Sequence, residues 1–547
     1  MAFDDIYPEG HQGGVCIIMN GHRVATNGDI RLEATPGQWQ PVPKQLDRKL
    51  GDNSITATLC YPDSSRHLTG FNPMIYPDLH LIYTVNVESK GKNIEVTVDL
   101  DRPIPQEFIG KVGFNLEFFP GSLFGKPWIM DGQSGIFPQQ PNSPLMTTQP
   151  NYLHTGNYHD GKQSLADMDK LIGKGYSPIV ADDIISEPYA KGTKFTSRPD
   201  DPYNKVTIES LSGDLQLFDG RMNHNNGWFV LRSNIKPGVT KGAVKWIITP
   251  NVVADWMYQP VIQTSQIGYH PTQDKEAVIE MDIRDNRKET AQIIRIDADG
   301  EKVVKNVTPA NWGKFLRYNY LKVDFTDVKE AGLYKIKYDT SVSPIFRIDN
   351  DVYARGVWQP VLEYFLPVQM CHMRVNEKYR VWHDCCHMDD AQMAPAHNHI
   401  DGYDQKEGLS KFKPGEVVPG VNIGGWHDAG DFDLRIESQA GESYILALAY
   451  EAFHPNLDVT SIDQINRVTE IHQPDGKNDL LQQVENGALT VVNGYLALGR
   501  LYRGIICNDL RQYVLLGDAA AMTDGKIGNE DDRWIFTEDN PGRELST

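Results

Sequence analysis

Two carboxylates three residues apart follow a Gly-Gly-Trp-His run in the stretch GGWHDAGDFD, residues 424–433. The two residues between Asp428 and Asp431 are Ala and Gly, so a water molecule or a substrate can approach both acids. Trp426 offers a flat apolar face on which a sugar ring can stack. Paired acids beside an aromatic side chain suit chemistry in which one carboxylate takes a proton from water. A lone pair of aspartates at this spacing is more often a surface turn, but the whole stretch is much more specific.

A second group of reactive residues lies upstream of this stretch. Cys371, Cys385 and Cys386 fall within sixteen positions of one another, close to several histidines. Six cysteines in 547 residues do not make a disulfide framework. Thiolate and imidazole groups are ligands that zinc prefers. The cluster therefore predicts a metal site, and buried thiols beside solvated histidines remain the alternative.

Three segments together resemble one enzyme family. The stretch 424–433 resembles the signature around the catalytic base of family 9 glycoside hydrolases, which are cellulase-like inverting enzymes. SQIGYHP (265–271) is similar to the opening of the immunoglobulin-like module that often precedes their catalytic domain. CCHMDDA (385–391) is similar to the Cys-His element upstream of their catalytic loop. The resemblance covers residues 260–547 and leaves the first 250 residues unexplained.

This resemblance implies an activity and the residues that perform it. Asp431 would be the general base, Asp428 would help to position the same water, and Trp426 would contact the substrate. The expected reaction is hydrolysis with inversion of a β-1,4-linked glucan such as cellulose, xyloglucan or mixed-linkage glucan. The family's general acid is a Glu that lies several hundred residues beyond the Asp pair. We therefore expect residues 1–547 to be an N-terminal portion that is inactive alone, with a separate C-terminal fragment supplying the acid.

The resemblance also implies a structural zinc ion, with calcium as a further candidate ion. The expected zinc ligands are Cys371, Cys386, His387 and His427, and His427 would anchor the loop that carries Asp428. This chain departs from the family pattern in having an extra thiol and a long interval between the two ligand histidines. One of Cys385, His397 and His399 can therefore replace an expected ligand.

Two other functions remain open. An exo-acting glucosidase or glucosaminidase of the same family would fit if the large N-terminal domain narrows the cleft from one end. A carbohydrate-binding protein with a degenerate catalytic domain would fit the missing acid, but it would not need the Asp428 and Asp431 pair. The chain contains neither a G-x-S-x-G nor an H-E-x-x-H motif, which leaves other hydrolase chemistries unsupported.

These residues must be positioned by at least two kinds of domain. Short segments that alternate apolar and polar residues predict a large β-sandwich over residues 1–255 and a small immunoglobulin-like sandwich over 256–348. From 349 to 547 the apolar spacing changes to three and four residues, which predicts helices over 351–370, 434–453 and 478–504. The resemblance identifies this last region as the first, incomplete part of an (α/α)6 barrel.

Composition limits the partners. The formal net charge is −20, from 53 basic and 73 acidic residues, which argues against nucleic acid or an anionic membrane as a partner. The apolar runs are too short for a transmembrane helix. Residues 1–5 do not begin a signal peptide, which fits either a cytoplasmic protein or one whose leader has been removed. The family resemblance favours a secreted, periplasmic or cell-surface protein.

Overall fold

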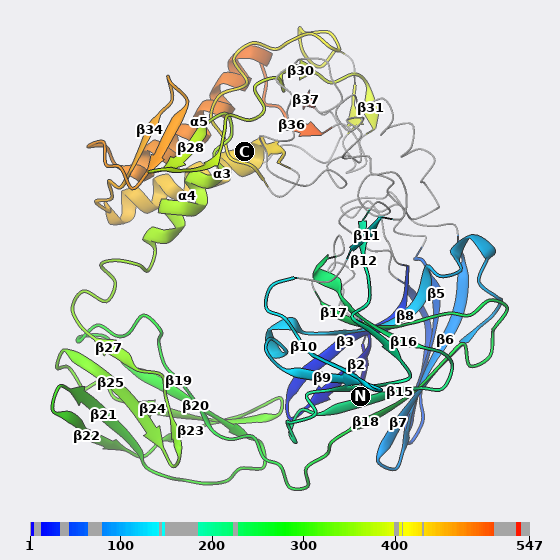
Figure 1. Cartoon of the computed structure of the whole chain (residues 1–547). Helices are drawn as coiled ribbons and strands as arrows, with labels where there is room; N and C mark the ends of the chain where they lie inside the picture. Colours follow the sequence, from blue (N-terminus) through cyan, green and yellow to red (C-terminus); the bar gives the residue numbers. More distant parts are fainter. Residues whose placement is uncertain are drawn as a thin grey trace. The chain divides into compact units, whose positions relative to one another are not determined.

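The computed structural model describes residues 2–4, 13–32, 43–63, 79–141, 145–147, 184–222, 228–398, 404–406, 408–428, 432–507 and 532–537. The chain divides into two compact units, one of which contains residues 252–362. Three parts follow one another along the sequence (Figure 1).

The first part consists mainly of two β-sheets. Across the seven-stranded sheet the order is β1 (Ala2–Asp4), β2 (Gly14–Met19), β3 (His22–Leu32), β8 (Val112–Phe118), β17 (Phe229–Asn234), β16 (Leu215–Asp219) and β13 (Ala190–Gly192). Across the nine-stranded sheet it is β10 (Gln133–Ile136), β9 (Pro127–Met130), β14 (Lys194–Ser197), β15 (Val206–Ser210), β18 (Val244–Pro250), β7 (Asn93–Leu100), β6 (Leu81–Lys90), β5 (Ser54–Tyr61) and β4 (Lys44–Leu50). A separate pair is formed by β11 (Leu145–Thr147) and β12 (Ile184–Ser186), and short 3-10 turns occur at Gln106–Phe108, Pro120–Ser122 and Gly220–Met222.

Alternating side chains from both sheets make one hydrophobic core. On β6, Leu81, Tyr83 and Val85 are buried while the residues between them are not. Because successive side chains on a strand point to opposite faces, this pattern leaves one face of the sheet for the core. Phe114 from the other sheet meets Trp246 edge to face, with ring centroids 5.1 Å apart. The described strands therefore agree with the sandwich predicted from alternation.

The second part is a smaller sandwich. One sheet has the order β19 (Val261–Gln263), β20 (Glu276–Asp282), β24 (Tyr318–Asp324) and β23 (Ala310–Phe315). The other has the order β22 (Gly300–Val307), β21 (Ala291–Asp297), β25 (Gly332–Tyr338) and β26 (Ser341–Val342), with β27 (Phe346–Ile348) also pairing with β25.

The segment SQIGYHP closes this small sandwich. Gly268 has a φ of +102°, and a Cβ there would lie 2.3 Å from the carbonyl oxygen of Arg347, so a larger residue would not fit. The hydroxyl of Tyr269 accepts a hydrogen bond from the backbone of Ser265 and donates one to the carbonyl of Glu276. The motif that predicted the module is therefore part of its structural frame.

The third part contains the helices α3 (Leu366–Gln369), α4 (Ile436–Phe453) and α5 (Asp479–Leu498), and a π-helical turn at Val361–Phe365 precedes α3. α5 begins where the side chain of Asn478 accepts a hydrogen bond from the backbone N–H of Leu480, and it ends at Gly499 in a left-handed conformation. α4 packs against α5. The predictions of helices over 434–453 and 478–504 are thus confirmed in their main part. Of 351–370, only the second half is helical, and the first half consists of turns and bends.

Short strands also occupy the region predicted to be helical. They are β28 (Arg374–Glu377), β29 (Arg380–His383), β30 (Gln392–Met393), β31 (His397–Asn398), β32 (Asp404–Gln405), β33 (Leu434–Arg435), β34 (Thr460–Asp463), β35 (Val468–Ile471), β36 (Gly504–Cys507) and β37 (Arg533–Phe536). One four-stranded sheet has the order β30-β37-β36-β33 and another the order β29-β28-β35-β34. The sequence did not predict these strands, and the (α/α)6 barrel stays a prediction.

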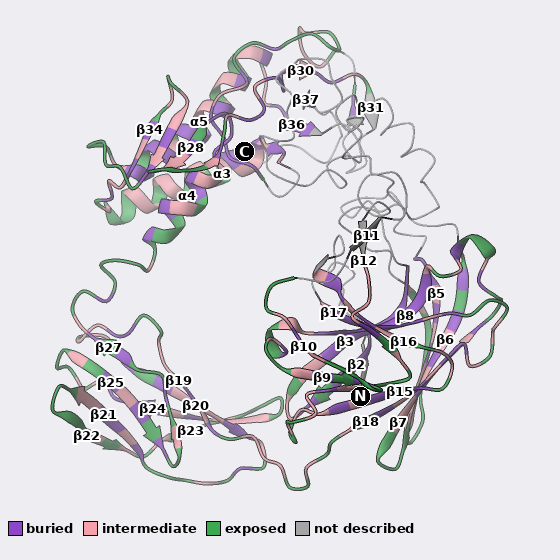
Figure 2. Ribbon diagram, in the orientation of Figure 1, coloured by how far each residue is buried: buried purple, intermediate pink, exposed green. Residues whose placement is uncertain are grey.

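Much of the apolar surface of α4 is exposed. Tyr444, Ile445, Leu448 and Phe453 are all exposed, and Figure 2 shows that exposed and half-buried residues make up most of this helix. None of the helices among the described residues combines the length and apolar character that crossing a membrane requires.

Candidate functional site

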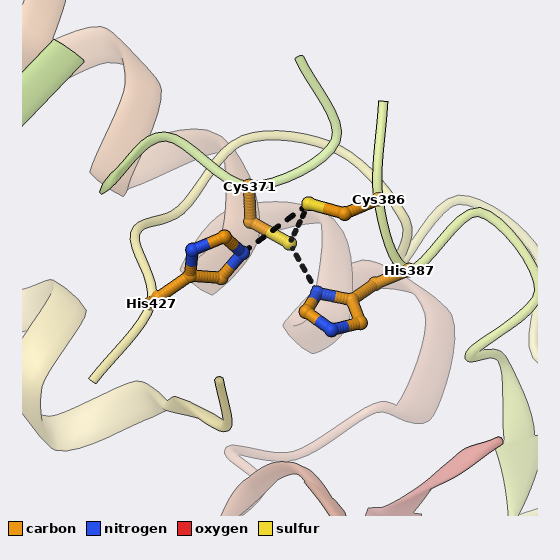
Figure 3. Close-up of side chains that lie close together, drawn as sticks. All are labelled: Cys371, Cys386, His387 and His427. Atoms are coloured by element: carbon orange, nitrogen blue, oxygen red, sulfur yellow. Dashed lines mark hydrogen bonds between the residues drawn. The ribbon is translucent and has the colours of Figure 1, made fainter. Parts of the chain in front are cut away.

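Four side chains from three separated segments meet at one point. Cys371 follows α3, Cys386 and His387 follow β29, and His427 precedes the aspartate stretch (Figure 3). Their ligand atoms all lie within 4.8 Å of one another, and all four residues are buried. Sγ of Cys371 is 3.6 Å from Sγ of Cys386 and 2.8 Å from Nδ1 of His387. Sγ of Cys386 is 3.2 Å from Nε2 of His427.

The geometry of this cluster fits a closed zinc centre. Zinc bonds of about 2.3 Å to sulfur and about 2.0–2.1 Å to nitrogen separate the ligand atoms of a tetrahedral site by roughly 3.3–3.8 Å. The sulfur–sulfur distance of 3.6 Å falls in this range, and the sulfur–nitrogen distances of 3.2 and 2.8 Å lie below it. The structure therefore brings together the four residues that the sequence named as ligands.

The protonation states also suit metal binding. Burial lowers the pKa of His387 to about 3, which leaves its imidazole neutral near neutral pH. The hydrogen bond from Cys371 holds the pKa of the Cys386 thiol well below its usual range, while burial raises the pKa of Cys371. One thiolate beside the neutral imidazole of His387 is a combination that a cation stabilises.

The residues named as alternative ligands do not join the cluster in the described part of the chain. The thiol of Cys385 points to the carbonyl of Arg467, at 3.9 Å. The side chain of His397 and the whole of His399 lie outside the described residues. A histidine that the sequence did not single out, His372, is buried nearby with its Nδ1 2.9 Å from the carbonyl oxygen of Gly424.

The two glycines of the stretch let it run close against α5. Gly424 and Gly425 have φ values of +68° and +86°, a conformation that favours glycine. A Cβ at position 424 would lie 2.3 Å from the carbonyl oxygen of Asn486. The backbone N–H of Gly425 donates to that same carbonyl, and the side-chain amide of Asn486 donates to the carbonyl of Gly425. Residues 424–425 are therefore clamped to α5 by backbone contacts.

Trp426 is buried and has a structural role, which corrects its expected role of stacking against a sugar ring. Its side chain is 1% exposed, so its ring has no free face for a substrate. The indole Nε1 donates to Oε1 of Gln483 on α5, at 2.9 Å. Gln439 on α4 accepts from the backbone N–H of Trp426 and donates to its carbonyl. The ring is thus an anchor between the two helices.

Of the two candidate catalytic acids, Asp428 is described and Asp431 lies outside the described residues. Asp428 has a side chain that is 30% exposed, and its Oδ2 lies 2.8 Å from Nε of Arg435. The backbone N–H of Asp428 donates to the carbonyl of Asp433, at 2.8 Å. This bond joins the positions on either side of residues 429–432.

A second group of buried carboxylates lies next to the cysteine–histidine cluster. It comprises Asp389, Asp390 and Asp532, whose oxygen atoms lie within 4.8 Å of one another. Oxygen ligands suit calcium, but the backbone N–H of Arg533 donates to Asp390 and its guanidinium lies 3.8 Å from that carboxylate. Arg533 therefore offsets part of the negative charge of this group, and calcium stays a prediction.

Comparisons with known proteins agree with the motifs. Residues 257–343 match the family model of the cellulase N-terminal ig-like domain. Endoglucanase D of Acetivibrio thermocellus is 22% identical over 238 residues, which are 43% of this chain and 34% of the relative. The match thus spans about a third of that protein's length.

Two solved structures also align with about half of this chain. A Zn-binding triple mutant of GH family 9 endoglucanase J30 is 20% identical, with a TM-score of 0.34, and the alignment covers 49% of this chain and 44% of that chain. Bacteroides ovatus GH9 is 18% identical, with a TM-score of 0.34, and the alignment covers 51% and 45%. Two matches support a relationship, namely that of residues 257–343 and that of the segment shared with Endoglucanase D. Over that segment, this chain is a relative of the cellulase-like family 9 glycoside hydrolases.

Proposed function

We propose that this protein is an inverting glycoside hydrolase that cleaves a β-1,4-linked glucan such as cellulose, xyloglucan or mixed-linkage glucan. The observation that carries the proposal is that α4 and α5 hold residues 424–426 by hydrogen bonds and leave the carboxylate of Asp428 partly exposed beside Arg435. Holding a reacting group in place lowers the entropic cost of reaching the transition state. The relationship to cellulase-like proteins supports the same chemistry.

In the proposed reaction Asp431 acts as the general base. It takes a proton from a water molecule while the water oxygen attacks the anomeric carbon from the side opposite the leaving sugar, which inverts the configuration. The glycosidic bond breaks in the same step, and the leaving oxygen takes a proton from the Glu that the family resemblance implies as general acid. Asp428 accepts a hydrogen bond from the same water and so orients it. Arg435 fixes one oxygen of Asp428, which limits the directions in which that carboxylate can point.

We also propose that Cys371, Cys386, His387 and His427 hold a structural zinc ion. When bound, the ion would cross-link three chain segments, and four protein ligands would leave it no open position for a substrate. Through His427 the site would fix the backbone next to Asp428. We further propose that the protein acts outside the cytoplasm, where polysaccharide substrates occur.

The proposal is tested on the natural full-length protein with carboxymethylcellulose, xyloglucan, mixed-linkage glucan and short cello-oligosaccharides. We expect reducing ends to be released from at least one of them, and Asp431→Asn to abolish release while the circular dichroism spectrum stays unchanged. A wild-type protein that binds these glucans without cleaving them would support the carbohydrate-binding alternative instead. Near-normal turnover in Asp431→Asn would remove that residue from the mechanism.

A further inference from the structure

A series of close polar contacts connects the cysteine–histidine cluster to Asp428. Nε2 of His387 lies 3.9 Å from Oδ2 of Asp390. The guanidinium of Arg533 lies 3.8 Å from Asp390 and 3.4 Å from Oδ1 of Asp433. Asp433 Oδ2 is in turn 3.8 Å from Nη2 of Arg435, which contacts Asp428 through its Nε.

One small β-sheet positions most of this series. Asp433 and Arg435 flank Leu434 where β33 begins, and Arg533 begins β37. β36 lies between these two strands and pairs with both. Because the sheet fixes the backbone of each arginine, their side chains approach Asp433 from two directions.

Asp433 occupies the central place in the series. Its side chain is fully buried, and both Arg435 and Arg533 approach its carboxylate. Its own carbonyl accepts the backbone N–H of Asp428. Asp433 thus contacts Asp428 in two ways. Its backbone carbonyl does so directly, and its side chain does so indirectly, by way of Arg435.

Because Asp433 is buried, its side chain has little freedom to move away from Arg435. An ion pair between partly exposed side chains, such as Asp428 with Arg435, contributes little on its own because both groups can rotate into water. A buried carboxylate that moves away from its arginines loses the compensation of its own charge, which costs several kcal/mol. Asp433 therefore restricts Arg435, and Arg435 restricts Asp428.

We infer that Asp433 is a positioning residue, which sets the direction of the Asp428 carboxylate through Arg435 without itself touching the substrate. The inference rests on the proposed function for its effect on turnover. Its structural part, the contacts among Asp428, Asp433 and Arg435, is independent of that function.

The variants that test it are Asp433→Asn, Arg435→Gln, Arg435→Lys and the double variant Asp433→Asn/Arg435→Gln, all made in the natural full-length protein. The matched control is Asp219→Asn, another buried aspartate whose partner Arg221 contacts it at 2.8 Å, in the first β-sandwich. Zinc content, kcat and KM on the best glucan, and hydrogen exchange of the peptide covering 424–435 are measured for each.

We expect kcat to fall about 10- to 100-fold in Asp433→Asn and in Arg435→Gln, with KM and zinc content unchanged, because misplacing a group by about 1 Å costs that much. The double variant should lose no more than the worse single variant, since both changes break one linkage. Arg435→Lys should recover part of the loss. Exchange in 424–435 should be faster in Asp433→Asn and Arg435→Gln and unchanged in Asp219→Asn.

Unchanged kcat and exchange in Asp433→Asn, or losses that add fully in the double variant, would overturn the inference. If the wild type cleaves no glycan but exchange still rises in the variants, the proposed function fails while the positioning role stands. If Asp433→Asn does not fold or loses zinc, the two Arg435 variants decide, since they leave the buried carboxylate in place.

Discussion

Sγ of Cys386 lies 3.2 Å from Nε2 of His427, although the two residues are 41 positions apart in the chain. His427 is the residue directly before Asp428, so the cluster that fits zinc and the acid stretch share one short piece of backbone. The backbone N–H of His427 also donates to the carbonyl of Gln369 at the end of α3. Any change in the cluster is therefore expected to reach Asp428.

The first prediction concerns the metal. Cys386→Ser should lower the zinc content from about one ion per chain to none, because a closed site needs all of its protein ligands. The midpoint of thermal unfolding should fall with it. Cys385→Ser is the control, since its thiol lies outside the cluster and points to Arg467. Equal zinc content in the two variants, measured by elemental analysis, would contradict the assigned ligand set.

The second prediction compares two glycines within helices. A Cβ at Gly487 on α5 would lie 2.4 Å from the Trp426 ring and 2.2 Å from Oγ of Ser443 on α4. Gly487→Ala should therefore cost about 1–3 kcal/mol of stability, as overpacking does. Gly441→Ala on α4 meets no atom within 4 Å and should be neutral or stabilise by up to about 1 kcal/mol. Denaturant unfolding monitored by circular dichroism measures both, and equal effects would argue against this packing.

The third prediction separates the two roles considered for Trp426. Trp426→Phe removes the donor to Gln483 and leaves a buried acceptor unpaired, which costs about 1–3 kcal/mol. Because the ring is buried, KM for the glucan should not change. A rise in KM without a loss of stability would restore the stacking role expected from the sequence.

The fourth prediction is a pH dependence at the start of α5. Burial raises the pKa of Asp479 to about 6 from an ordinary value near 4. The folded protein therefore binds this proton more tightly than the unfolded chain does, and the contribution of Asp479 to stability should decrease as pH rises from about 4 to about 6. Above that range Asp479 is ionised in the folded protein, and the loss of stability from its buried charge no longer increases.

Asp479→Asn should remove this dependence. The variant's unfolding midpoint, relative to wild type, should be higher at pH 7.5 than at pH 4.5. A difference that is the same at both pH values would show that Asp479 does not titrate in this range.

The four candidate zinc ligands could be selected from the sequence because the choice depends on residue type and on local motifs, and zinc binding itself stays a prediction. Cys371, Cys386, His387 and His427 are the residues that the structure brings together. The sandwich strands were predictable for a similar reason, since alternation such as that in β6 is a local signal. Helices α4 and α5 likewise follow from apolar spacing, and α5 has Asn478 and Gly499 at its ends.

The role of Trp426 was not predictable, because it depends on partners far along the chain. A tryptophan beside two aspartates suggested a sugar platform, but Gln439 and Gln483 enclose it from two helices. The short strands β33, β36 and β37 were missed because their pairing joins segments that are distant in sequence and contain only two to four residues each. The series of polar contacts from His387 to Asp428 depends on that sheet, so no local sequence pattern predicts it.

The most direct test of the account is the configuration of the first product. Proton NMR of the sugar released in the first minutes of cleavage, recorded before the reducing end equilibrates, distinguishes the two anomers. We predict that the α anomer appears first from a β-1,4-glucan and that Asp431→Asn releases none. A β anomer as the first product would mean that the configuration is retained through a glycosyl-enzyme intermediate, and it would contradict the assignment of Asp431 as the base that activates water.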